Sequence, residues 1–171
     1  MTALQAPVAA GTWLVSDSRT RVGFSVGNLG ATVHGTVACR WGRVEIGEDG
    51  APRRVRAEMD LDSLDTGIAR RDSDLRKPRF LDIDRYPVMT WSADRFTRAG
   101  DGRWAAEGVL CVRGTSAPLT LVGAPEPDGG GIRVQAAGEL DRRAVGIRAP
   151  ALVVGRTVRI AIDAWLTPSV P

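Results

Sequence analysis

The fold class is decided by residues 54–93, RVRAEMDLDSLDTGIARRDSDLRKPRFLDIDRYPVMTWSA. Apolar and polar residues alternate at both ends of this stretch, with Val55, Ala57 and Met59 before the middle and Met89 and Trp91 after it. A period of two is typical of a β-strand with one buried and one exposed face. The middle, residues 65–87, is rich in Arg, Asp and Leu and interrupts the pattern for about twenty residues. We therefore expect two strands joined by a polar insert that has a function of its own.

The same alternation extends over most of the chain, and sustained helical periodicity is nearly absent. Phe24 and Val26 near the start, and Ile160 and Ile162 near the end, follow it. Turns containing Gly and Asp separate the segments, which predicts about eight strands. A sheet with one apolar face packs on a second sheet or closes on itself, and closure removes exposed edges. We predict an all-β fold, an extended eight-stranded antiparallel β-barrel. An immunoglobulin-like sandwich fits less well because the strands are long and the Cys…Trp…Cys spacing is absent.

The insert predicts a short helix around residues 67–77. Asp65 or Thr66 can cap it, its body runs from about Ile68 to Arg76, and Pro78 ends it. A helix this short needs a surface to dock on, and the open end of a barrel offers one. The apolar residues that would form its underside are Leu75, Phe80, Leu81 and Ile83.

Length and composition fit a single globular domain. The chain has 171 residues, of which 43% are hydrophobic and 25% charged, as in an ordinary globular protein. We predict a flexible N-terminal segment (residues 1–11), one barrel domain (12–167) and a short tail (168–171). No apolar run approaches the length of roughly 20 residues that crosses a bilayer, and the start lacks the features of a secretory signal. We therefore expect a cytoplasmic protein without a membrane span.

The basic net charge does not indicate a nucleic-acid partner. The net charge is +3 and the sequence pI is about 9.5. The arginines are scattered among Asp and Glu, with no basic run and no aromatic RNA-binding motif. This pattern favours a solvated outer face, and we expect no binding to nucleic acid.

No combination of residues in the sequence builds a catalytic or metal site. His34 is the only histidine, and on its strand it lies out of phase with Val33 and Val37, so we expect it to point outward. Cys39 shares the inward phase whereas Cys111 does not, which predicts two unrelated reduced thiols. We expect no catalytic residue, no metal and no cofactor.

The inward-facing positions are the strongest functional signal. They carry large apolar residues interspersed with small ones, which leaves two interpretations open. The small residues either compensate for the large ones in a solid core, or they leave a lumen for an apolar guest. The candidate ligand-binding residues are Phe24, Val26, Val37, Met59, Leu61, Leu75, Phe80, Met89, Trp91, Leu110, Val112, Leu121 and Ile160.

Residues 63–87 match the motif S-L-x-T-x-I-x-x-R-D-x-x-L-R-x-x-x-F-x-D-x-x-x-Y-P. Three further elements occur around it in order. They are Trp13 with Phe24-Ser25-Val26, Leu29-Gly30 and Gly35; Gly108, Leu110, Val112-Arg113-Gly114 and Ser116; and Arg142 with Gly146-Ile147. In these residues the chain resembles the YceI-like, lipocalin-like polyisoprenoid-binding proteins, from Trp13 to about Leu166.

This resemblance implies a barrel whose elongated apolar cavity holds a polyisoprenoid, a prenyl quinone tail or another long lipid, in a carrier role without catalysis. We expect Leu75, Phe80 and Trp91 to close one end of the cavity. Arg71 and Asp72 would fix the insert by a charge-assisted pair. A structural or stress-response barrel with a filled core and a protein partner is the alternative, and a homodimer is left open. The chain departs from the family pattern at Ser16, Arg19, Asn28, Ala144 and Val145.

Overall fold

The computed structural model describes residues 8–147 and 155–169. Its strands are β1 (Gly11–Val15), β2 (Arg21–Asn28), β3 (Ala31–Ile46), β4 (Pro52–Asp65), β5 (Val88–Gly100), β6 (Arg103–Val112), β7 (Thr115–Asp128), β8 (Gly131–Asp141) and β9 (Thr157–Pro168). Its helices are α1 (Ala69–Leu75) and the 3-10 turns η1 (Asp17–Arg19) and η2 (Arg142–Val145). The terminal segments predicted outside the barrel fall partly beyond the described residues, which exclude 1–7 and 170–171.

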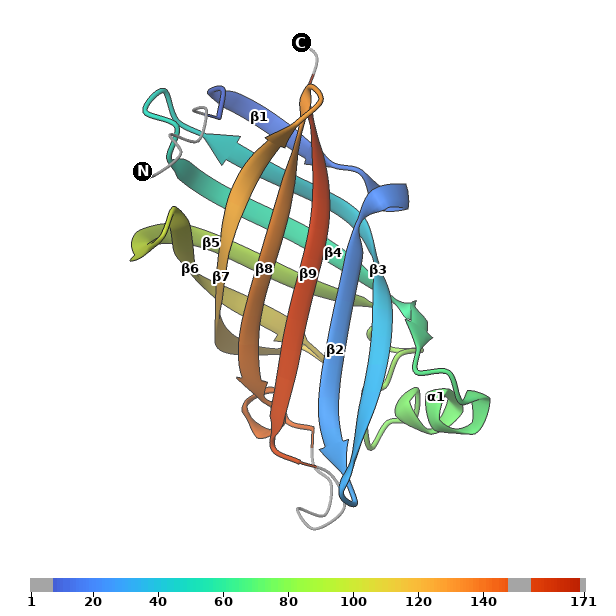
Figure 1. Cartoon of the computed structure of the whole chain (residues 1–171). Coiled ribbons are helices and arrows are strands. Elements are labelled where there is room, and N and C mark those ends of the chain that lie inside the picture. The colour runs from blue at the N-terminus through green and yellow to red at the C-terminus, as the bar shows by residue number, and fades with distance from the viewer. Residues whose placement is uncertain (1–7, 148–154, 170–171) are drawn as a thin grey trace.

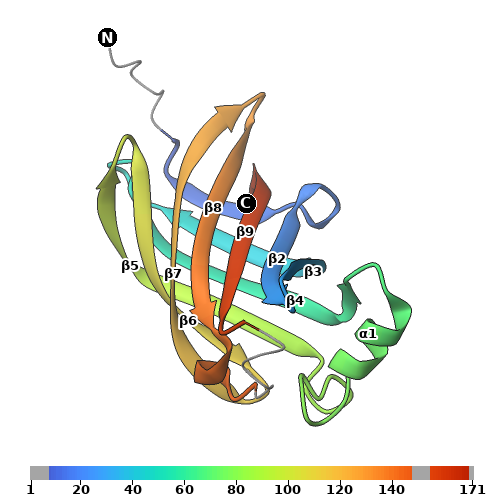
Figure 2. The same cartoon turned by 60° about the horizontal axis from the view of Figure 1, so that its bottom comes forward.

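The strands form a closed antiparallel barrel, as predicted. Each strand from β2 to β9 pairs with the next one, and β2 pairs with β9 to complete the circle. The register at this closing seam joins Phe24 to Ile160 and Val22 to Ile162. Figure 1 shows β7, β8, β9 and β2 crossing over the remaining strands, and Figure 2 shows the wall from one end, with α1 at its rim.

β1 and β2 occupy a single position in the barrel, one after the other. β1 pairs with the far part of β3, where Trp13 faces Val44, and with the end of β9, where Val15 faces Leu166. β2 continues between the other halves of the same two strands. The turn η1 separates the two segments. The barrel therefore keeps eight strand positions while the described chain contains nine strands.

Two β-bulges change which residues point inward. In β3, Cys39 pairs with Met59 and the next paired residue is Trp41, which faces Glu58. In β5, Ala93 pairs with Gly108 and the next paired residue is Arg95. An extra residue shifts the alternation by one. Trp41 is consequently 43% exposed.

The barrel has two ends of different construction. The β2–β3, β4–β5, β6–β7 and β8–β9 connections lie at one end, with α1 among them, and we call it the insert end. At the opposite end, which we call the β1 end, there is a separate buried cluster of Trp13, Ile46, Ile132 and Leu166. In Figure 1 the insert end is at the lower right and β1 is at the top.

The insert forms the predicted helix but is capped differently. α1 runs from Ala69 to Leu75 with Ile68 at the N-cap, and Ile68 makes no side-chain capping bond. Asp65 instead accepts a hydrogen bond from the backbone N–H of Gly67 (2.8 Å). The capping role predicted for Asp65 or Thr66 is therefore wrong. The reason is local, because Gly67 has a positive φ of 82° and turns the chain before the helix begins.

Thr66, the first residue after β4, is hydrogen-bonded to two residues of α1. Its hydroxyl donates to the Asp72 carboxylate, whose oxygen also accepts from the Thr66 backbone N–H (3.0 Å). Arg71 donates to the Thr66 hydroxyl (2.8 Å) and carbonyl oxygen (2.7 Å). Arg71 and Asp72 thus fix the insert as expected, but each bonds to Thr66, where a direct pair between the two was predicted.

Candidate functional site

An apolar cavity of about 380 Å³ runs through the barrel. Side chains from β2 to β9 line its wall, residues of the insert lie at one end, and Val15, Ile46 and Leu166 lie at the other. A volume between about 300 and 1,000 Å³ is typical of small-molecule sites. The inward-facing residues therefore surround a lumen and do not form a solid core.

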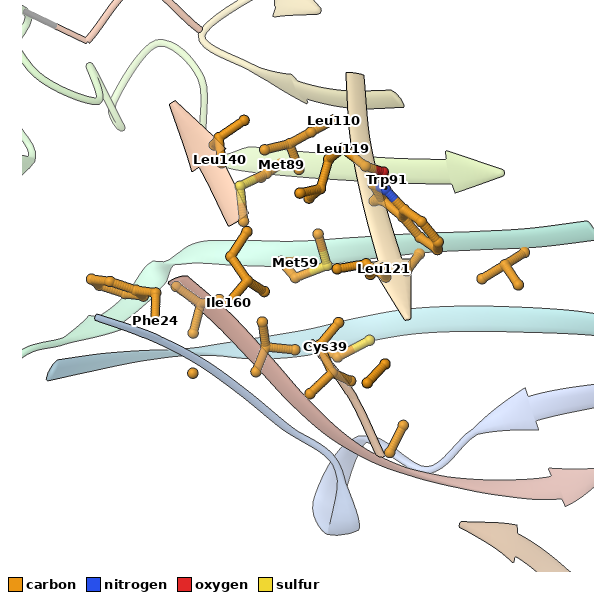
Figure 3. Close-up of a pocket in the computed structure, with 18 of the residues that line it drawn as sticks. Phe24, Cys39, Met59, Met89, Trp91, Leu110, Leu119, Leu121, Leu140 and Ile160 are labelled. Atoms are coloured by element: carbon orange, nitrogen blue, oxygen red, sulfur yellow. Dashed lines mark hydrogen bonds between the residues drawn. The ribbon is translucent and has the colours of Figure 1, made fainter. Parts of the chain in front are cut away.

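The thirteen candidate ligand-binding residues all lie on this cavity. They come from seven strands and from the insert: Phe24, Val26, Val37, Met59, Leu61, Leu75, Phe80, Met89, Trp91, Leu110, Val112, Leu121 and Ile160. In Figure 3, Phe24 and Ile160 approach the lumen from one side and Trp91 and Leu121 from another. Strand alternation therefore places eleven of these side chains in one cavity, and the insert adds Leu75 and Phe80.

Trp91 is fixed in the wall by a glycine and a hydrogen bond. A Cβ atom on Gly108 would lie 2.5 Å from the indole ring, so the ring covers this glycine on the neighbouring strand. The Trp91 Nε1–H donates to the carbonyl oxygen of Leu119 (3.0 Å). The indole satisfies its polar atom in the wall and leaves its apolar surface to the cavity.

Phe24 is set in the same way on the other side of the barrel. It pairs across the strands with Gly35, where a Cβ atom would lie 2.3 Å from the ring. A large ring opposite a glycine fills the wall without narrowing the lumen. Both glycine–aromatic pairs therefore help to set the width of the cavity.

Three polar residues reach the lining, and each has a bonding partner. Thr20 accepts a hydrogen bond from the Trp165 backbone N–H (3.1 Å). The Cys39 thiol donates to the carbonyl oxygen of Trp41 (3.3 Å), and burial raises its pKa, so it stays protonated at neutral pH. Arg142 is 4% exposed and donates to the carbonyl oxygens of Gly155 and Ile147, both at 2.9 Å.

Residues of the insert line one end of the cavity, and hydrogen bonds hold this segment to the barrel. Ile83 is fully buried in the main core, whereas Leu75 and Phe80 are half-buried and face the lumen. Arg113 donates to the carbonyl oxygen of Phe80 (2.8 Å) from the β6–β7 turn. Arg76 bonds to Asp62 (2.7 Å), which fastens the insert to β4. Leu75 and Phe80 thus lie at the insert end as predicted, whereas Trp91 lies farther along the wall, on β5.

Sequence reasoning missed several lining residues. Phe96 lies beyond the β5 bulge, so a strict alternation from Trp91 puts it outside; a bulky apolar residue out of phase was the available signal. Leu140 and Val145 belong to a second feature. Among the described residues, β7 pairs with β8 from Val122 to Asp128 but not before, and η2 packs against β7 where the pairing stops. Val145, which lies on η2, is 1% exposed and lines the cavity.

The remaining candidates lie outside the cavity. His34 is exposed on the outer face, and Cys111 is half-buried and does not line the lumen. The described part of the chain contains no group of three potential metal ligands. Within the same residues, no helix has the length and hydropathy needed to cross a membrane. Of the positions that depart from the family pattern, Arg19 stacks on Trp165 (3.8 Å to the ring centre).

Similar sequences cover part of the chain. A UPF0312 protein of Vibrio campbellii is 31% identical over 87 residues, which span 48% of this chain and 46% of that protein. A UPF0312 protein of Yersinia pestis is 32% identical over 71 residues, which span 42% of this chain and 36% of that protein. The chain thus matches just under half the length of these relatives at most.

Similar solved structures cover nearly the whole chain and share its fold. BcnA of Burkholderia cenocepacia superposes with a TM-score of 0.78 at 15% identity, over 88% of this chain and 98% of its own. A polyisoprenoid-binding domain of Saccharophagus degradans gives 0.70 at 13% identity, over 92% and 98%. The YceI-like domain model matches residues 13–166. The chain therefore belongs to the YceI-like family.

Proposed function

We propose that this protein is a non-catalytic carrier that holds one long apolar lipid in the barrel cavity. The guest would be a polyisoprenoid, a prenyl quinone tail or a chain like that of a fatty acid. The observation that carries the proposal is the continuous lumen of about 380 Å³ lined almost entirely by apolar side chains.

The driving force for such a guest is burial of its hydrocarbon. Each buried methylene contributes roughly 0.8 kcal/mol, so about twenty carbons give on the order of ten kcal/mol or more. Ordering a flexible chain offsets much of this, and a dissociation constant of about micromolar or lower remains. The lining supplies few hydrogen-bonding groups, so the length and width of the cavity would select the guest.

The chemistry of the lining supports binding rather than catalysis. Its ionisable groups are the Cys39 thiol, held protonated by its raised pKa, and the Arg142 guanidinium, which bonds to backbone carbonyl oxygens. Acid–base catalysis needs a group that exchanges protons near neutral pH. The only histidine of the sequence, His34, is exposed on the outer face and is not part of the lining.

The relatives support the same proposal. The Saccharophagus degradans domain with this fold is described as polyisoprenoid-binding. Its wall and the wall of this chain share an architecture, and an apolar guest fits the lumen described above.

Extraction and titration test the proposal. Purified protein is extracted with organic solvent for mass spectrometry, and delipidated protein is titrated with a prenyl quinone dispersed in detergent while its thermal stability is recorded. We expect a co-purifying lipid or a rise in melting temperature with ligand. Protein that is empty when purified and gains no stability from prenyl quinones or fatty chains would refute the carrier role.

The insert end provides a residue-specific test. Phe80→Asp puts a carboxylate at the end of the lumen and should abolish lipid uptake while leaving the circular dichroism of the strands unchanged. Val109→Asp is the matched control, because Val109 is 48% exposed on the outer face of β6. If Phe80→Asp binds as the control does, the role of Phe80 in closing the cavity is wrong.

A further inference from the structure

We propose that the insert end of the barrel docks on an anionic lipid bilayer, with Leu29 and Ile68 inserted among the lipids and arginines on the head groups. The inference rests on the proposed function, because a guest that is insoluble in water has to be collected from a membrane or delivered to one. Two apolar residues and a charge asymmetry carry it.

Leu29 is an apolar residue at a position whose backbone favours a polar one. It is at the tip of the β2–β3 hairpin, is 74% exposed, and has a φ of 49°. The left-handed region is unfavourable for a leucine, while Asn and Asp tolerate it. Neither burial nor local conformation therefore explains a leucine here.

Ile68, on the insert, is also an apolar residue at a position that favours a polar one. It is the N-cap of α1, is 52% exposed and makes no capping hydrogen bond. N-cap positions favour Ser, Thr, Asp and Asn, which bond to the free N–H groups of the first turn. Leu29 and Ile68 are the two most exposed large apolar side chains in the described chain, and both belong to connections at the insert end. Residues that break a local rule without a structural gain point to function.

Charge is distributed unequally between the two ends. The described residues that connect strands at the insert end carry ten basic side chains against four acidic ones. The basic residues are Arg70, Arg71, Arg76, Lys77, Arg79, Arg85, Arg113, Arg142, Arg143 and Arg156, and the acidic ones are Asp72, Asp74, Asp82 and Asp84. Counting the adjoining strand residues Asp65 and Asp141 still leaves ten against six. At the β1 end the β3–β4, β5–β6 and β7–β8 connections carry Glu48, Asp49 and Asp101 and no basic residue, and the β1–β2 connection has one of each sign, Asp17 and Arg19.

Several of these arginines are available to a head group. Arg70, Arg79, Arg85 and Arg156 are exposed, and none forms a salt bridge with another described residue. Arg79 lies over the ring of Phe80, 4.7 Å from its centre, so a basic group is next to a residue that lines the lumen. An anionic surface attracts such a cluster.

The apolar residues favour a bilayer over a nucleic acid as the partner. A polyanion such as RNA would engage the arginines but would leave Leu29 and Ile68 in water. An interfacial site combines apolar side chains that insert with basic ones that contact head groups. Docking in this orientation would place Phe80 and the cavity end against the lipid phase, so that a guest could pass between them.

Flotation with vesicles tests the proposal. Full-length protein is mixed with vesicles of phosphatidylcholine alone, or of equal parts phosphatidylcholine and phosphatidylglycerol. We expect binding to the anionic vesicles that weakens as salt is added. Leu29→Asn and Ile68→Ser should each lower the vesicle affinity by about tenfold. Both substitutions suit the local backbone, so the melting temperature should stay the same or rise.

Reversing the charge of a single arginine tests the contribution of the basic residues. Arg79→Glu should lower affinity for anionic vesicles by about tenfold, whereas Arg54→Glu, exposed on β4 near the β1 end, should not. Vesicle binding that is unaffected by Leu29→Asn and Ile68→Ser would overturn the proposal, as would binding to RNA and not to vesicles. Prenyl quinone titration in detergent is measured in parallel. If prenyl quinone raises the melting temperature but the protein does not bind vesicles, the docking proposal is refuted and the carrier role stands. If the protein binds vesicles but gains no thermal stability from prenyl quinone, the carrier role is refuted.

Discussion

Replacing Ile83 by alanine should detach the insert from the barrel. Ile83 has 0% of its surface exposed and belongs to the main core cluster, so truncation removes a fully buried side chain. Isoleucine-to-alanine changes in cores cost about 2–5 kcal/mol. The matched control is Ile68→Ala, the same change in the same insert at a side chain that is 52% exposed. Exposed sites change stability by about 0.5 kcal/mol or less.

Urea unfolding followed by tryptophan fluorescence measures the difference. With a slope of about 2 kcal/mol per molar urea, Ile83→Ala should lower the midpoint by about 1 M or more, and Ile68→Ala by a few tenths. Ile83→Val, expected to cost about 0.5–1.5 kcal/mol, gives a graded point should the alanine variant fail to fold. Equal midpoints for Ile83→Ala and Ile68→Ala would show that Ile83 is not what anchors the insert.

Two further predictions concern the wall and the η2 turn. Gly108→Ala should destabilise the barrel by about 1–3 kcal/mol, because the new Cβ atom would meet the Trp91 indole at 2.5 Å. Gly27→Ala is the control, because a Cβ atom at Gly27 would have nothing within 4 Å. Equal denaturation midpoints for the two variants would refute the packing argument. The hydrogen bonds from Arg143 lower the pKa of Asp141 to about 2, so this carboxylate stabilises the fold above its ordinary pKa of 3.8 and loses that effect as pH falls towards 2. In an NMR titration Arg143→Ala should raise this pKa towards 3.8, and an unchanged value would contradict the pairing.

The barrel and its lining were predictable because strand alternation is a direct record of burial. Residues such as Met59 and Trp91 alternate with charged or polar neighbours, and their period alone places them on the inner face. The insert was predictable in part. Its apolar residues indicate docking, and the structure identifies Ile83 as the buried anchor.

The remainder depended on backbone detail that a pattern does not carry. A bulge changes the phase of a strand, so the outward position of Trp41 could be assigned only once the pairing was known, and Phe96 gave no more than the signal of an apolar residue out of phase. The sequence pattern predicted a cap at Asp65 or Thr66, but Gly67 turns the chain and Ile68 takes the N-cap position.

The seam between β2 and β9 has a consequence for biosynthesis. Its paired residues, such as Ser25 and Arg159, are at least 134 positions apart in the chain. A nascent chain therefore emerges from the ribosome with its lumen-facing residues in water until the last strand arrives. Contacts of such long sequence separation also form slowly. A half-made barrel exposes an apolar interior and free strand edges, so this protein should depend on chaperones during translation more than its modest size would indicate.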